Sequence, residues 1–297
     1  MTLGLATLLV LIALVGGVCI TAIGPGGIFV TIALFQLLDL SPGTVAGTAS
    51  VTFVATGILG SLAYLRSGEL RGRTATRAAV ILSGASVVGA FAGAWLNSRL
   101  DAQGFGILLG AFVAGTGVLI LVREERARRA VRAAEGVRTV EGVRRAKGDQ
   151  AREAEGIEPH EGEAGSPHPG APPTLALASG RGRLAMGLVG VGVGLPAGLL
   201  GVGGPVLAVP VLVVLGVPML LAVGLAQVQS IFISAFAALG YAMQGVIDWG
   251  LALLVGIPLL LGTAAGWWVA HRIPVGGLKR WLAVVLVLVG VYLLAGG

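Results

Sequence analysis

The sequence is poor in charged residues and in cysteine, and each shortage excludes a class of protein. Charged residues make up 11% of the 297 residues, whereas a soluble domain usually carries about 25%. Such a chain cannot cover a water-facing surface, so lipid must be its solvent. Cys19 is the only cysteine, which excludes a disulfide or a thiolate metal site within one chain.

The charges that are present are concentrated in one stretch. Residues 123–183 hold 22 of the 34 charged residues, as 12 Lys/Arg and 10 Asp/Glu, and the other 12 lie at or near the ends of apolar runs. The formal net charge of +6 therefore describes loops. No aromatic residues are interleaved with the basic stretch, so we expect no nucleic-acid partner.

The middle of every apolar run lacks Asp, Glu, Lys, Arg and His. An intramembrane protease would need an in-membrane Ser/His or Asp pair, and proton-coupled transporters commonly carry an ionisable residue there. There is also no Walker loop for ATP hydrolysis. We therefore expect a protein that is not an enzyme and holds neither a metal ion nor a cofactor.

Ten apolar segments predict an all-α polytopic membrane protein. They cover residues 3–22, 24–38, 42–65, 74–98, 103–122, 184–200, 203–217, 219–243, 248–270 and 276–295. A helix needs ~20 residues to cross a ~30 Å bilayer core. Segments 24–38 and 203–217 reach only ~22 Å as helices, so we expect them to be half-length, re-entrant or broken helices. The runs lack the alternation of a membrane β-barrel.

The charged stretch divides the chain into three parts. Residues 1–122 and 183–297 form two transmembrane units, and residues 123–182 form a charged cytoplasmic linker. The beginning of the linker can continue as an exposed helix. Its Pro/Gly-rich end has too little apolar content to fold, so we expect the linker to be largely disordered.

The two apolar units read as repeats of one another. The Gly24–Gly27 cluster aligns with the Gly201–Gly204 cluster at an offset of 177, and the same offset brings Tyr64 onto Tyr241. After a four-residue slip, Gly89-x-x-x-Gly93 aligns with Gly262-x-x-x-Gly266, a pattern that we interpret as a helix-packing motif, and Arg99 then meets Arg272. This shared order of unusual features predicts two homologous repeats of about five segments each.

The orientation of the repeats follows from Lys and Arg in short loops, which favour the cytoplasmic side. Loop 66–77 carries four arginines, the linker begins with several more, and the positive loop of the second unit is 271–280. If all three are cytoplasmic, the second repeat is inverted relative to the first. A parallel repeat would put 271–280 outside, so we favour the inverted arrangement and keep the parallel one as the alternative.

The glycine clusters are the first candidates for a binding site. Each cluster begins a short segment and allows the chain to turn inside the membrane. Irregular backbone at that depth is tolerated only where it lines a cavity or is buried by protein. Each following helix then directs its N-terminus, with a partial positive charge, at the cavity. Two such ends could form an anion site. Close helix packing is the alternative explanation for the same glycines. The candidates are Gly24, Gly26, Gly27, Gly201, Gly203 and Gly204.

The next candidates are polar residues in the segments that follow the clusters. Thr48 and Ser50 lie in segment 42–65, and Gln227 and Gln229 lie in segment 219–243. Hydroxyls and amides can donate hydrogen bonds to an oxyanion. Glutamine inside a span is costly without a partner, whereas hydroxyls often bond back to their own helix. We therefore favour the glutamines, with interhelical hydrogen bonding as the alternative.

The glycine clusters, the duplication and the sequence Ala46-Gly-Thr-Ala-Ser resemble the TauE/SafE family of sulfite exporters. The resemblance covers both apolar units and excludes the linker. It implies a secondary transporter or facilitator in the plasma membrane that moves sulfite, an organosulfonate or another small oxyanion. The alternative from another class is a membrane scaffold or assembly subunit without transport. The expected partners are a small anion and the lipid bilayer, and a homo-oligomer remains open.

Overall fold

The computed structural model describes residues 2–70, 72–154, 180–272 and 276–295. These residues form ten α-helices, and no strand occurs among them. The first unit contains α1 (Leu3–Ala22), α2 (Ile28–Leu37), α3 (Pro42–Arg66), α4 (Arg73–Asn97) and α5 (Ala102–Ala154). The second contains α6 (Gly180–Leu200), α7 (Pro205–Val214), α8 (Met219–Met243), α9 (Trp249–Arg272) and α10 (Gly276–Leu294). The all-helical prediction is therefore confirmed.

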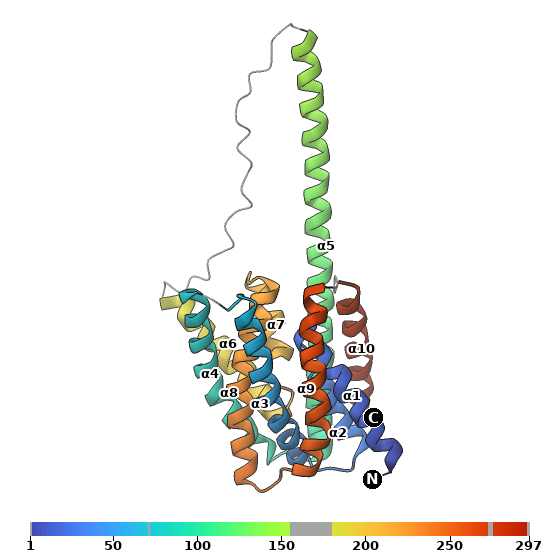
Figure 1. Cartoon of the computed structure of the whole chain (residues 1–297), viewed down its shortest axis with the longest axis vertical. Helices are drawn as coiled ribbons and strands as arrows, with labels where there is room; N and C mark the ends of the chain where they lie inside the picture. The colour runs from blue at the N-terminus through green and yellow to red at the C-terminus, as the bar shows by residue number, and fades with distance from the viewer. Residues whose placement is uncertain (1, 71, 155–179, 273–275, 296–297) are drawn as a thin grey trace.

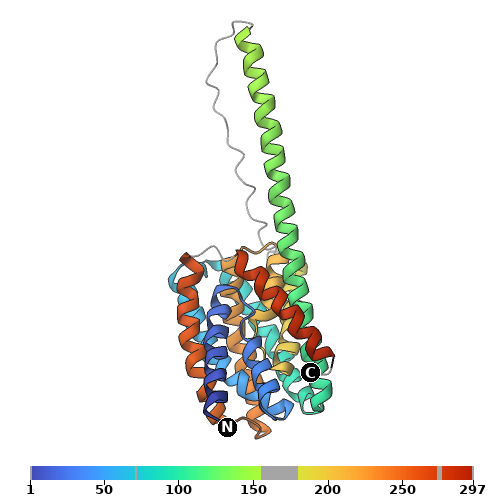
Figure 2. The ribbon, with the colours of Figure 1, turned by 90° about the vertical axis from the view of Figure 1, so that its right-hand side faces the viewer.

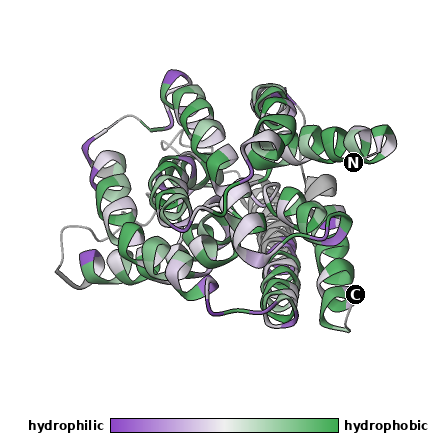
Figure 3. Ribbon diagram, turned by 90° about the horizontal axis from the view of Figure 1, so that it is seen from below, coloured by the Kyte–Doolittle hydropathy of each residue, from purple (hydrophilic) through white to green (hydrophobic). Residues whose placement is uncertain are grey.

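Seven of these helices contain stretches long and apolar enough to cross a membrane, namely α1, α3, α4, α5, α6, α8 and α9. The shorter apolar helices are α2, α7 and the Arg280–Leu294 part of α10. Many large hydrophobic side chains are exposed on the outside of the bundle as well as buried in its core, and the ribbon seen along the bundle is mostly coloured as hydrophobic (Figure 3). A water-soluble protein could not expose so much apolar surface, so the chain is a multi-pass membrane protein.

The longest helix, α5, continues far beyond the bundle. It runs without interruption from Ala102 to Ala154, and its second half projects away from the other helices (Figure 1). The first half of the predicted linker is thus helical, whereas the predicted disordered end, residues 155–179, lies outside the described residues. The last turns of the helix carry the charged sequence that could not be buried in lipid.

Helices of the first unit pack against helices of the second unit. α1 packs on α9 and α4 packs on α6. A methyl group added at Gly93 would lie 2.2 Å from the carbonyl oxygen of Leu195, and one added at Gly266 would lie 2.3 Å from that of Val18. Backbones this close leave room only for glycine. The packing role predicted for the Gly-x-x-x-Gly motifs is therefore confirmed.

α3 and α8 form the centre of the bundle and run antiparallel. Near one end, Gly47 of α3 faces Tyr241 of α8, and near the other end Gly224 of α8 faces Tyr64 of α3. α5 and α10 are also antiparallel, since Gly110 meets Gly290 whereas Gly117 meets Ala283. An antiparallel relation between helices in matching positions of the two units is the geometry that an inverted repeat requires.

The connections divide between the two ends of the bundle. The α3–α4 loop, the projecting part of α5 and the C-terminal end of α9 lie at one end (Figures 1 and 2). The beginning of α1, the α4–α5 loop and the α8–α9 loop lie at the other end. Arg66 at the end of α3, Arg73 at the start of α4 and the charged half of α5 thus lie on one side of the bundle.

Candidate functional site

Each unit contains a hairpin with a buried turn, formed by α1 and α2 in the first unit and by α6 and α7 in the second. Every residue of 19–28 and of 197–206 is buried. The turns need glycine, since φ is +114° at Gly24, +62° at Gly201 and +75° at Gly203, values that other residues rarely adopt. The sequence therefore interrupts two membrane helices inside the protein, as the glycine clusters predicted.

The two turns lie against each other. The hydroxyl of Thr31 in α2 donates a hydrogen bond to the carbonyl oxygen of Gly201, at 2.6 Å. A methyl group added at Gly27 would lie 3.0 Å from the carbonyl oxygen of Val202, and one added at Gly24 would lie 2.9 Å from Val209 of α7. The structure thus brings together the two glycine clusters, which are about 177 residues apart in the chain.

Close packing also accounts for some of these glycines. A methyl group added at Gly26 would lie 2.2 Å from the carbonyl oxygen of Gly16, so α2 folds back directly on α1. Gly203 is different, because a methyl group added there would lie 3.4 Å from its nearest neighbour, the Phe53 ring. That is an ordinary contact distance. Gly26 is therefore a packing residue, and Gly203 is a residue that sets the backbone conformation.

The short helices begin at these turns without a side-chain cap. Gly27 precedes α2 and Gly204 precedes α7, and neither helix start is capped by its N-cap side chain. The first N–H groups of a helix lack intrahelical partners, and they carry a partial positive charge. The N–H of Gly204 reaches the Ser230 hydroxyl at 3.4 Å, at the long limit of a hydrogen bond. At the start of α2, the N–H groups of Phe29 and Val30 already donate to the carbonyl oxygens of Gly26 and Gly27, at 3.3 and 3.1 Å. Neither helix start has a cap from its own N-cap side chain, and the two starts lie close together inside the protein.

α3 contributes a face made of Ala46, Ser50 and Phe53, which helical spacing places in one stripe. Ala46 lies against Gly201, and the Phe53 ring lies against both Gly27 and Gly203. Ser50 lies between them in the stripe and is 2% exposed. Sequence reasoning missed Phe53, because a phenylalanine in an apolar helix carries no signal that separates it from the core.

α8 contributes Gln227 and Ser230 from the opposite side. The Gln227 amide donates to the carbonyl oxygen of Ile20, at 3.3 Å, in the last turn of α1. Its side chain also packs on Gly60 of α3. Gln227 thus joins α8 to the helix end before the first turn, and Ser230 joins it to the second turn. The interhelical hydrogen bonding considered for the glutamines is what Gln227 makes.

Gln229 is the unusual polar residue of this region. Its side chain is 0% exposed, and neither its amide nitrogen nor its carbonyl oxygen has a hydrogen-bond partner within the described residues. It follows Val228, which faces α4, and precedes Ser230, which faces the second turn. Each unpaired buried polar group costs about 1–3 kcal/mol. A buried amide without partners calls for an explanation, and a bound ligand that supplies the partners is one.

Thr48 lies apart from the turns. Its hydroxyl accepts a hydrogen bond from the N–H of Asp248 at 3.1 Å, at the loop before α9. The Thr48 side chain therefore supports the start of α9, on the side of α3 away from Ser50. Of the ten candidate residues, Thr48 is the one whose polar group is directed elsewhere, which the spacing of two residues between Thr48 and Ser50 could have indicated.

The region is polar but uncharged. In the described part of the chain, the buried polar groups belong to Thr, Ser, Asn and Gln side chains and to the hydroxyls of Tyr64 and Tyr241, and none of these groups is charged. Within the same residues, no group of three or more His, Cys, Asp or Glu side chains could hold a metal ion. The only charge of the region is the partial charge of backbone dipoles, which suits an anion at the helix starts.

Comparison with known families gives one finding. A family model described as Sulfite exporter TauE/SafE matches residues 9–293, which is nearly the whole chain and includes both hairpins. No curated protein and no solved structure matches the chain significantly.

Proposed function

The chain belongs to the TauE/SafE family of sulfite exporters, and from that premise we propose that it moves sulfite or an organosulfonate across the plasma membrane as a secondary transporter or facilitator. The observation that carries the proposal is the meeting of two interrupted helices inside a protein that also buries Gln229 without a hydrogen-bond partner among the described residues. A membrane scaffold has no need for either feature.

We place the anion between the α1–α2 and α6–α7 turns. The N–H groups at the starts of α2 and α7 supply the partial positive charge. Ser50 and Gln229 supply neutral hydrogen-bond donors, and both side chains are buried. Gln227 holds the end of α1 in place through Ile20. Donors and dipoles together replace the water that the anion loses on entry.

A site without a cationic side chain favours a singly charged anion. Removing a second charge from water costs much more than removing the first, and no buried cation offsets that cost. Bisulfite and monosulfonates are therefore better substrates than sulfate. A proton that travels on bisulfite would also remove the need for an ionisable residue in the membrane.

The described conformation represents a closed state in this proposal. The Phe53 ring fills the space between Gly27 and Gly203, so an anion enters only when the ring or one of the hairpins moves. The positive edge of an aromatic ring can then face the anion. Antiparallel packing of α3 on α8 supports an inverted repeat, in which the two units exchange roles during transport.

The test is flux of radiolabelled anions into proteoliposomes that contain the purified full chain. We expect uptake of sulfite and of a monosulfonate above that of sulfate, with sulfite uptake rising as the pH falls toward the bisulfite form. The Gln229→Leu variant should take up less sulfite at equal protein density. Empty vesicles and vesicles with the variant are the controls. Flux no higher than in empty vesicles for both sulfur anions would contradict the proposal and leave the scaffold alternative.

A further inference from the structure

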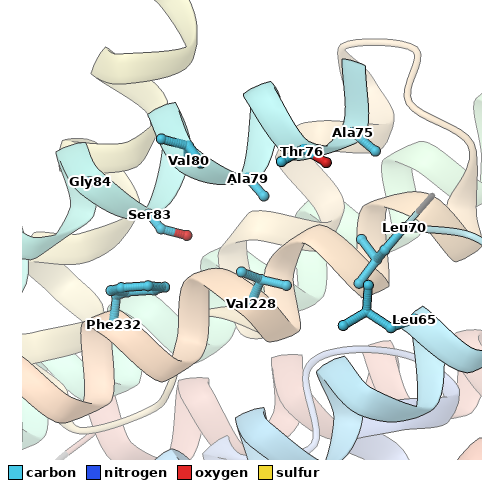
Figure 4. A pocket seen from close by; sticks show the side chains of 10 residues that line it. All are labelled: Leu65, Leu70, Ala75, Thr76, Ala79, Val80, Ser83, Gly84, Val228 and Phe232. Atoms are coloured by element: carbon cyan, nitrogen blue, oxygen red, sulfur yellow. The ribbon is translucent and has the colours of Figure 1, made fainter. Parts of the chain in front are cut away.

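A second binding region lies away from the two turns, in a groove between α4 and α8. The groove has a volume of about 430 Å³ and is lined by residues from the end of α3, the α3–α4 loop, α4 and α8. Its lining side chains are apolar except for Thr76 and Ser83 (Figure 4). Val80 is 66% exposed and Phe232 is 41% exposed, so the groove opens to the surface that lipid covers.

The mouth of the groove carries positive charge. Arg73, Arg77, Val80 and Gly84 follow one another at spacings of four, three and four residues, which places them in one stripe along α4. Val80 and Gly84 line the groove, so the two arginines continue its wall toward the end of the bundle. Both arginines are exposed.

The surrounding charges keep this mouth positive. Arg66 ends α3 beside Leu65, which lines the groove. Glu69 is the one acidic residue of the 66–77 segment, against four arginines, and it accepts a hydrogen bond from the Ser67 hydroxyl. An apolar groove below a cluster of arginines matches a molecule with an acyl chain and an anionic headgroup.

We propose that this groove binds an anionic phospholipid, with one acyl chain between α4 and α8 and the phosphate beside Arg73 and Arg77. Arginine near a membrane surface attracts anionic lipids, and its long side chain extends from the helix to the headgroup level. A zwitterionic lipid would fill the same groove but gain less from the arginines. The inference does not depend on transport, because it concerns a surface outside the two turns.

The chain offers a matched pair of variants for the acyl chain. Gly84 lines the groove, and a methyl group added there meets nothing within 4 Å, so Gly84→Leu should fill the groove without disturbing the protein. Gly192 of α6 is also exposed, has the same free space and lies outside the groove. Gly192→Leu therefore controls for the change in helix propensity.

The experiment measures binding of phosphatidylglycerol and phosphatidylcholine with identical acyl chains to the full chain in detergent, by native mass spectrometry. We expect wild type to prefer phosphatidylglycerol. Arg73→Gln and Arg77→Gln should each weaken that binding roughly fivefold, which corresponds to about 1 kcal/mol for each basic residue. Arg99→Gln, at the other end of the bundle, should leave it unchanged. Gly84→Leu should weaken binding of both lipids, and Gly192→Leu should not.

Three results would overturn the proposal. The first is equal affinity of wild type for the two lipids, which would show that the groove takes any lipid. The second is unchanged phosphatidylglycerol binding in Gly84→Leu, which would place the lipid elsewhere. The third is the same loss in Arg99→Gln as in Arg73→Gln, which would indicate non-specific attraction. Sulfite flux decides none of these results, so the lipid site and the transport proposal can fail separately.

Discussion

Tyr64 and Tyr241 perform the same task in the two units. The hydroxyl of Tyr64 donates a hydrogen bond to the carbonyl oxygen of Thr21 at 2.8 Å, and the hydroxyl of Tyr241 donates one to the carbonyl oxygen of Gly198 at 2.9 Å. In both pairs the acceptor residue lies 43 residues earlier in the chain. Both carbonyls belong to the last turn of a helix that ends at a buried glycine turn. The final carbonyls of a helix lack intrahelical partners, so each tyrosine satisfies a group that the interruption leaves unpaired.

We expect Tyr241→Phe to destabilise the protein, because the buried carbonyl oxygen of Gly198 loses the Tyr241 hydroxyl as its donor, whereas that of Leu199 keeps the Asn97 amide at 2.8 Å. The cost should be about 1–3 kcal/mol, measured as a lower thermal unfolding temperature in detergent. Tyr64→Phe should have an effect of the same sign, because the buried carbonyl oxygen of Thr21 loses its donor. Tyr292→Phe is the control, since Tyr292 is 61% exposed. A Tyr241→Phe protein as stable as the control would show that the turn does not need this bond.

The sequence predicted much of the fold because its signals are local. Apolar runs predicted the helices, and glycine clusters predicted the interruptions near Gly24 and Gly201. The continuous helix through Ala154 was harder to predict, since the charged half of α5 has no apolar face that must pack. The tyrosines were used only as markers of a repeat, because a sequence does not show which carbonyl a hydroxyl will reach.

The candidate site was predicted less completely. Pairing of the two glycine clusters followed from the duplication, and burial of Gln227 and Gln229 followed from their place in an apolar helix. Thr48 was grouped with Ser50, although a spacing of two residues places them on different faces of a helix. Phe53 could not be predicted, since its position between two turns depends on tertiary packing.

Alanine substitutions should separate the packing glycines from the conformational ones. In Gly26→Ala the new methyl group would meet the Gly16 carbonyl oxygen at 2.2 Å and the Ile20 nitrogen at 2.4 Å. Because these are backbone atoms that cannot move independently, we expect little folded protein. Gly203→Ala has room for its methyl group but must keep φ at +75°, which costs about 1–2 kcal/mol.

The measurement is the yield of monodisperse protein and its unfolding temperature in detergent. Gly192→Ala, at an exposed position with free space, is the control. Equal yields of the Gly26 and Gly203 variants would contradict the distinction, and so would a Gly203 variant that is as stable as wild type.

Labelling of introduced cysteines should establish the orientation of the two units. In a Cys19→Ala background, Ser67→Cys tests the α3–α4 loop, which we expect to be cytoplasmic, and Leu215→Cys tests the α7–α8 loop, which lies at the same end of the bundle. Both side chains are exposed. We expect both to resist an impermeant thiol reagent in intact cells and to react after permeabilisation. Ser98→Cys, at the opposite end, should react in intact cells.

The informative residue is Leu215, because the parallel arrangement would put its loop on the same side as Ser98. Reaction of Leu215→Cys in intact cells, with Ser67→Cys still protected, would rule out the inverted repeat. The packing of Gly224 on Leu70 supports our expectation, since it places the start of α8 beside the α3–α4 loop.

Replacing each of the two buried glutamines by leucine should change the stability of the empty protein in different ways. Gln227→Leu removes the donor to the Ile20 carbonyl oxygen, so the empty protein should lose about 0.5–1.5 kcal/mol of stability. Gln229→Leu removes two polar atoms that have no partner in the described residues, so the empty protein should be unchanged or more stable.

The affinity of the Gln229→Leu protein for the anion should instead fall by about 1.5–3 kcal/mol, or roughly 10- to 150-fold, if Gln229 bonds the charged substrate. Thermal unfolding with and without sulfite measures both effects, because a ligand that binds the folded state raises its unfolding temperature. A Gln229→Leu protein that loses stability while sulfite still protects it fully would show that Gln229 has a structural partner and does not bind the anion.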